Sequence, residues 1–129
     1  MTADQYNEKE ALRQYAVINL QRLATDLEWR TFTLAIKRDK AAATDSARAR
    51  LPSWIAREPP EAVEKSLAGI DVVRQGIIDR IVSDCENRNI EPNRCPKCNG
   101  VVRTPMAEQC LWCGHCWHGK TKLESLSNL

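Results

Sequence analysis

Five of the six cysteines in this chain fall in one short segment, CPKCNGVVRTPMAEQCLWCGHCWHGK, at positions 95–120. A segment of about 25 residues cannot bury enough apolar surface to fold alone, whereas structural zinc contributes on the order of 10–16 kcal/mol in small peptides. The opening sequence, MTADQYNEKEALRQY, shows no secretory signal, so we expect a cytoplasmic location with reduced thiols. In that setting CxxC pairs indicate metal binding more often than disulfides. The segment therefore predicts a small module that folds around a metal ion.

The first pair of ligands is predicted to be Cys95 and Cys98, in the motif CPKCNG. In a zinc-binding turn the residue after the second cysteine often adopts a left-handed backbone conformation, which favours glycine or asparagine. Asn99 followed by Gly100 supplies that residue type.

Two choices compete for the second pair. Cys110 and Cys113 are followed by Gly114, which repeats the pattern of the first turn, whereas a pair ending at Cys116 is followed by Trp117. The Cβ atom of tryptophan is penalised in the left-handed conformation, so turn chemistry favours the first choice. The predicted ligands are Cys95, Cys98, Cys110 and Cys113, and the alternatives are Cys116 in place of Cys110 or a ligand from His115 or His118.

The stretch CPKCNGVVRTPMAEQCLWCGHCWHG resembles the short zinc-ribbon modules of many small bacterial and bacteriophage proteins. Those modules share a CPxCG-like first turn and a CxxCGH-like second turn followed by tryptophan. The resemblance places the family's Zn²⁺ ligands at Cys95, Cys98, Cys110 and Cys113. This sequence departs from the pattern at Asn99, where glycine is usual. The resemblance covers residues 95–119 and is specific for a metal rather than for a function.

The N-terminal part of the chain is predicted to be helical, because residues 1–51 contain neither glycine nor proline. Asn7 followed by Glu10 reads as a capping box. One amphipathic helix is therefore expected from Asn7, or from an earlier start capped by Thr2, to about Lys40, with a fray or a restart expected within AAATDSARAR at residues 41–50. Its apolar stripe recurs at steps of three, four and seven residues, at Ala16, Leu20, Leu23, Leu27 and Leu34.

Pro52 is predicted to end the first helical region, because the residue before a proline disfavours the α conformation. A second long helix is expected after it. The stretch LPSWIAREPP then reads as a connector, and Pro60 suits the first turn of a helix that ends near residues 86–89. Gly69 and Gly76 would interrupt this helix at about 1 kcal/mol each, or would let another helix approach closely. Its apolar stripe is Val63, Leu67, Ile70, Val73, Ile77, Ile81 and Cys85.

The expected fold class is mainly α, with two long amphipathic helices in a hairpin and a small C-terminal zinc ribbon. The predicted boundaries are 1–88 for the hairpin, 89–94 for a linker, 95–119 for the ribbon and 120–129 for a tail. A lone hairpin leaves apolar surface exposed, so we expect a homodimer, with a compact monomer as the alternative. No run of residues approaches 18 consecutive apolar positions, so no membrane span is expected.

The formal net charge of +2 is too small to indicate a nucleic-acid-binding protein by itself. The C-terminal part is nevertheless basic, and five residues are candidates for contacts with the phosphates of nucleic acid: Arg94, Lys97, Arg103, Lys120 and Lys122. Trp112 and Trp117 either pack over the metal core or stack on unpaired bases. For docking onto a protein partner, the candidate anchors are the Leu111–Trp112 edge and the connector around Trp54.

A catalytic role is not expected, because four cysteine ligands leave no open position on the metal. The sequence also lacks a glycine-rich phosphate-binding loop. These observations predict a small zinc-binding regulatory protein of bacterial or phage type that acts on transcription through nucleic acid or RNA polymerase. The alternative is a protein–protein adaptor or host-protein inhibitor with a purely structural zinc and no nucleic-acid contact.

Overall fold

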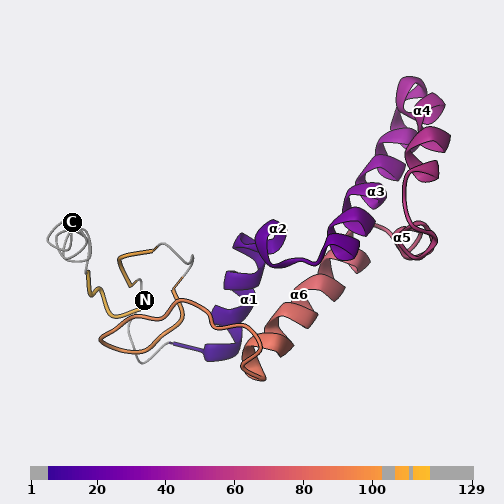
Figure 1. Ribbon diagram of the computed structural model, residues 1–129. Coiled ribbons are helices and arrows are strands. Elements are labelled where there is room, and N and C mark those ends of the chain that lie inside the picture. Colours follow the sequence, from indigo (N-terminus) through magenta and orange to yellow (C-terminus); the bar gives the residue numbers. More distant parts are fainter. Residues whose placement is uncertain (1–5, 103–106, 111, 117–129) are drawn as a thin grey trace, which may run out of the picture. The chain divides into compact units, whose positions relative to one another are not determined.

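The computed structural model describes residues 6–102, 107–110 and 112–116, and this part of the chain is mainly helical (Figure 1). Its β structure consists of two isolated antiparallel bridges. None of the described helices combines the length and the apolar character that a bilayer crossing requires. The helices are α1 (Glu8–Ile18), α2 (Leu20–Leu23), α3 (Asp26–Ala43), α4 (Asp45–Ala56), α5 (Pro60–Ser66) and α6 (Ile70–Glu86). The predicted mainly α class is confirmed.

The chain forms two compact units. One combines the described residues up to Asn19 with those from Val82 onward, and therefore holds α1 and the cysteine segment. The other is Leu20–Ile81, with α2 to α5 and most of α6. The division at residues 88, 94 and 119 stays a prediction, because it concerns segments that would fold independently.

The prediction of one continuous helix from Asn7 to Lys40 is wrong, although its start is correct. The side chain of Asn7 accepts a hydrogen bond from the backbone N–H of Glu10 at 2.9 Å and caps α1. The helix ends at Asn19, whose backbone N–H and side-chain amide both donate to the carbonyl of Tyr15, at 3.0 and 2.9 Å. A side chain that competes for a backbone carbonyl in this way favours a helix end.

A capping box begins α3, whereas at α1 the structure shows only the Asn7 half of the predicted box. Thr25 Oγ1 accepts from the N–H of Glu28 at 3.1 Å, and the Glu28 carboxylate accepts from the N–H of Thr25 at 2.8 Å. The same carboxylate receives the guanidinium of Arg80, whose Nε lies 2.9 Å from Oε2. Arg80 also donates to the carbonyl of Leu23 at 2.9 Å, so one arginine ties α6 to the start of α3.

Replacing Glu28 by glutamine is expected to lower the stability of the Leu20–Ile81 unit by about 1.5 kcal/mol at pH 7, since hydrogen bonds to charged groups are lost. Burial raises the pKa of Glu28, but the hydrogen bonds from Arg80 and Thr25 outweigh it and hold that pKa below its ordinary value. The carboxylate therefore stabilises the fold above the unfolded-state pKa of about 4.3, and this contribution is lost as the pH falls through the lower folded-state pKa.

Urea unfolding followed by circular dichroism at pH 7 and pH 3 measures both effects. The Glu28→Gln variant should lose less stability than the wild type between the two pH values, because its side chain does not titrate. Glu64→Gln, at an exposed position, is the matched control and should keep the wild-type pH dependence. Identical pH dependence in the wild type and Glu28→Gln would contradict this role for Glu28.

The prediction that Pro52 ends the first helical region is also wrong, because Pro52 lies inside α4. The turn falls earlier, at Thr44, which ends α3 and begins α4, so the restart expected within residues 41–50 is confirmed. The N–H of Thr44 donates to the carbonyl of Lys40 at 2.9 Å, and its hydroxyl accepts from the N–H of Ala47 at 3.4 Å. A proline inside a helix loses one backbone hydrogen bond, and the packing of α4 along α3 overrides that preference (Figure 1).

The second long helix is divided as well. Pro60 begins α5 as predicted, but Gly69 has a φ of +97° and separates α5 from α6. A left-handed glycine is a common helix terminator, so Gly69 acts as a stop signal rather than as a tolerated interruption. Leu67 is 68% exposed and does not belong to the buried stripe. The end of α6 at Glu86 agrees with the predicted end.

The short helix α5 is fastened to α3 by Arg38. Its Nε donates to Ser66 Oγ at 2.8 Å and its Nη2 to the carbonyl of Val63 at 3.3 Å. Ser66 is almost fully buried, at 1% exposure, and its hydroxyl is satisfied by accepting from Arg38 and by donating to the carbonyl of Val63 at 2.7 Å.

Candidate metal centre

The structure brings the sulfur atoms of Cys95, Cys98, Cys110 and Cys113 within 4.8 Å of one another. The Sγ atoms of Cys95 and Cys113 are 3.7 Å apart, and those of Cys98 and Cys110 are 3.6 Å apart. A tetrahedral zinc ion about 2.3 Å from each ligand requires sulfur–sulfur separations of about 3.8 Å. A disulfide would require about 2.05 Å. The four thiols are therefore spaced for a metal ion rather than for disulfides.

The first cysteine turn is closed by short-range backbone hydrogen bonds. The N–H of Cys95 donates to the carbonyl of Gly100, and the N–H of Asn99 donates to the carbonyl of Cys95, both at 2.9 Å. An antiparallel bridge between Arg94 and Val101 flanks the turn. Asn99 has a φ of 63°, so the left-handed conformation predicted at this position is confirmed.

The second turn repeats this arrangement. The N–H of Cys110 donates to the carbonyl of His115 at 2.8 Å, and the N–H of Gly114 donates to the carbonyl of Cys110 at 3.0 Å. Gly114 is left-handed, with a φ of 79°. An antiparallel bridge joins Gln109 to Cys116. Cys116 thus occupies the position equivalent to Val101 in the first turn. Cys116 is a bridge partner and not a member of the sulfur cluster.

Backbone N–H groups point at the cysteine sulfurs in both turns. In each case the donor lies two residues after the cysteine: Lys97 to Cys95 at 3.4 Å, Gly100 to Cys98 at 3.4 Å, and Trp112 to Cys110 at 3.3 Å. A backbone hydrogen bond from His115 lowers the pKa of Cys113 to about 7. Hydrogen bonds to the charged form favour the thiolate, which is the form that binds metal, whereas burial raises the pKa of Cys110 and raises that of Cys98 to about 12.

The chemistry of the donor set fits a closed structural site. Cys95 and Cys110 are 1% and 0% exposed, and four thiolates complete a tetrahedral shell. A catalytic zinc ion keeps one position for water or substrate, and this arrangement provides none. The four residues would therefore hold an ion whose contribution is to fold the segment.

Two of the five basic residues predicted to contact nucleic acid lie in the described part of the chain. Arg94 Nη2 forms an ion pair with Glu8 at 2.9 Å, and its Nη1 donates to the carbonyl of Asn99 at 3.0 Å. This guanidinium is therefore engaged in holding the fold. Lys97 is exposed on the first turn. Outside the described residues lie Arg103, Lys120 and Lys122, together with Leu111, Trp117 and His118.

Trp112 is buried, with 8% of its surface exposed. Its indole Nε1 donates to the carbonyl of Val101 at 2.6 Å. The burial predicted for Trp112 is confirmed, and the alternative of an exposed anchor at this residue is wrong; that Trp112 covers a bound metal ion stays a prediction.

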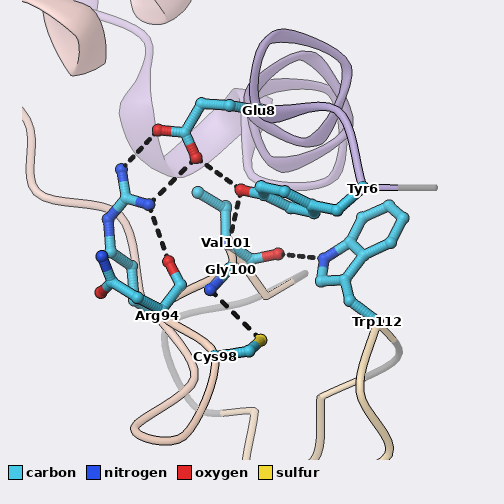
Figure 2. Close-up of polar contacts among 8 residues, drawn as sticks. Tyr6, Glu8, Arg94, Cys98, Gly100, Val101 and Trp112 are labelled. Carbon is cyan, nitrogen blue, oxygen red and sulfur yellow. Dashed lines mark hydrogen bonds and ion pairs between the residues drawn. The ribbon is translucent and has the colours of Figure 1, made fainter. Parts of the chain in front are cut away.

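Tyr6 and Glu8 belong to this site and were not predicted from the sequence. The Tyr6 hydroxyl accepts from the N–H of Val101 at 2.9 Å and donates to the Glu8 carboxylate (Figure 2). Burial and the hydrogen bond to Glu8 raise the pKa of Tyr6 to about 12, so the hydroxyl keeps its proton at neutral pH. No spacing in the sequence pairs residues 6–8 with residues 94–101.

Comparisons with protein-family models, with curated proteins and with solved structures gave no match to this chain. Its function is therefore inferred from the chemistry of the site and of the surface.

Proposed function

We propose that this chain is a small zinc-binding regulatory protein whose Zn²⁺ ion is structural and is held by Cys95, Cys98, Cys110 and Cys113. The observation that carries the proposal is the cluster of four thiols within 4.8 Å, which leaves no coordination position for a substrate. The ion then holds the cysteine module folded, and the protein acts by binding rather than by catalysis. Elemental analysis of the purified protein should find one zinc per chain. Iron in its place would overturn the zinc assignment, because a tetrahedral set of four sulfurs accepts either metal.

A groove in the Leu20–Ile81 unit supports action through a protein partner. It encloses about 440 Å³ between α3, the end of α5 and α6. Val72, which lines the groove, is 62% exposed, and Leu67, the residue that follows α5, is 68% exposed. Exposed apolar surface of this kind is typical of protein interaction sites. The lining residues are Leu27, Glu28, Thr31, Lys65, Ala68, Val72, Val73, Gly76, Ile77 and Arg80.

RNA polymerase is the partner through which such a protein would act on transcription. An adaptor or host-protein inhibitor would use the same surface on another protein. The second candidate function is direct binding of nucleic acid, and the observation that favours it is the exposed Lys97 at the tip of the first cysteine turn.

Replacing Val72 by glutamate should weaken partner binding at least about tenfold, because a charge would be buried in an apolar contact. Val17→Glu, on α1 and outside the groove, is the matched control for an added charge on an exposed valine. Binding to purified RNA polymerase is measured by biolayer interferometry with and without nuclease. Sedimentation of the same variants tests the expected homodimer. Equal binding by both variants would remove the groove from the proposal.

Nucleic-acid binding is tested separately by fluorescence anisotropy of a labelled duplex across a series of salt concentrations. If Lys97 contacts a phosphate, Lys97→Ala should reduce the salt slope of binding by about one. A slope that does not change would exclude that contact.

A further inference from the structure

The segment Tyr6–Glu8 contacts the first cysteine turn, and Tyr6 does so through the backbone of the turn. The Tyr6 hydroxyl accepts the N–H of Val101 at 2.9 Å, while the indole of Trp112 donates to the carbonyl of the same residue at 2.6 Å. Both backbone polar groups of Val101 are thus held by aromatic side chains (Figure 2). The two rings also contact each other edge to face, with centroids 5.0 Å apart and an interplanar angle of 75°.

Glu8 makes a second contact with the same turn, through Arg94. The Glu8 carboxylate accepts hydrogen bonds from both terminal nitrogens of Arg94, at 2.9 and 3.0 Å, and from the hydroxyl of Tyr6. Arg94 passes this contact on to the turn by donating to the carbonyl of Asn99 at 3.0 Å. A two-nitrogen pair of this kind fixes geometry as well as charge.

These contacts fall on the groups that orient two of the four sulfurs. Residues 94 and 101 are bridge partners on either side of the turn. Between them, Gly100 donates its N–H to the sulfur of Cys98 at 3.4 Å and accepts the N–H of Cys95 at 2.9 Å. Tyr6 and Glu8 therefore stand one step behind the sulfur atoms and are positioning residues for the metal centre.

From this geometry we infer that the N-terminal segment is a metal-responsive latch. A filled centre holds the turn in the shape that accepts Tyr6 and Glu8. Loss of the ion removes that shape, because so short a segment cannot hold itself folded, and the start of α1 is released. The coupling is reciprocal, so the docked segment raises metal affinity by the factor by which metal favours docking. The inference rests on the metal centre proposed above and adds a regulated segment to it.

The affinity for Zn²⁺, measured by competition with a chromophoric chelator, tests the first half of the coupling. Tyr6→Ala should weaken binding about tenfold, the lower end of the range for residues that support metal ligands. Tyr6→Phe keeps the ring contact with Trp112 and loses only the hydroxyl, so it should recover most of the affinity. Lys9→Ala, an exposed neighbour on α1, is the control and should bind as the wild type does.

Hydrogen exchange with and without zinc tests the second half. In the wild type, removing the ion should speed exchange at the amides of α1 and at Val101, while the amides of α3 should not change. In Tyr6→Ala, exchange in α1 should be fast in both states. Unchanged exchange in α3 also verifies that the Leu20–Ile81 unit of each variant folds.

The outcomes separate the latch from the metal site. A wild-type protein that binds no zinc would sink both proposals. Normal zinc binding together with full affinity in Tyr6→Ala, or with metal-independent exchange in α1, would overturn the latch and leave the metal site standing.

Discussion

Replacing Cys110 by serine is expected to release the metal and unfold the cysteine module, whereas replacing Cys116 by serine should leave the metal content unchanged. Cys110 is fully buried and its sulfur lies 3.6 Å from that of Cys98. If 10–16 kcal/mol of binding energy is shared by four ligands, the loss of one costs about 3 kcal/mol, or about a hundredfold in affinity. Cys116 is exposed and serves as the bridge partner of Gln109, a role that serine's backbone fills equally well.

Zinc per chain, determined on both variants after dialysis against a weak chelator, measures the difference. Exchange of the amides in the second turn, such as that of Gly114, reports whether the module stays folded. Metal retained in Cys110→Ser and lost in Cys116→Ser would show that the second pair of ligands is Cys113 and Cys116.

The four members of the sulfur cluster could be predicted because the signal is local. Each CxxC turn closes through hydrogen bonds between residues at most five positions apart, so its requirements are visible within one motif. The left-handed residue is the informative one: Asn99 and Gly114 accept that conformation, and Trp117 would not. That single preference separates Cys110 from Cys116 as a cluster member.

The predicted helix ends were wrong because the periodic apolar stripe continues past the local signals that begin and end a helix. The apolar stripe from Ala16 to Leu34 keeps its period across the break between α1 and α3, so the pattern alone predicts one helix. The signal for the break was present in the sequence, since Thr25 and Glu28 have the spacing of a capping box. Gly69 was predicted to interrupt a continuous helix at a cost of about 1 kcal/mol, whereas its left-handed conformation ends α5.

The contacts between distant segments could not be predicted at all. Tyr6 meets Val101 across 95 residues, and Glu28 meets Arg80 across 52. Neither pair has a spacing rule, because their meeting depends on how whole helices pack. The consequence for the site is concrete: the sequence predicts which atoms bind the metal, and the fold determines what holds those atoms in place.

Replacing Gly100 by alanine is the second large effect, and it should weaken metal binding by about ten- to a hundredfold. A Cβ at this position would lie 3.1 Å from Trp112 Cδ1 and 3.3 Å from both Cys98 Sγ and Tyr6 Cε2. Trp112 is held by its hydrogen bond to Val101, and the sulfur of Cys98 is held once a metal is bound. With all three neighbours constrained, the added methyl group acts as overpacking, which costs about 1–3 kcal/mol.

Gly76→Ala is the matched control, because the same methyl group would meet nothing within 4 Å there. That residue lies within α6, where alanine is favoured over glycine by about 1 kcal/mol. Chelator competition and thermal unfolding should therefore show opposite signs: Gly100→Ala loses zinc affinity and unfolds at a lower temperature, and Gly76→Ala keeps its affinity and unfolds at a higher one. If Gly100→Ala bound zinc as tightly as the wild type, the close packing around the first turn could not be what fixes Cys98.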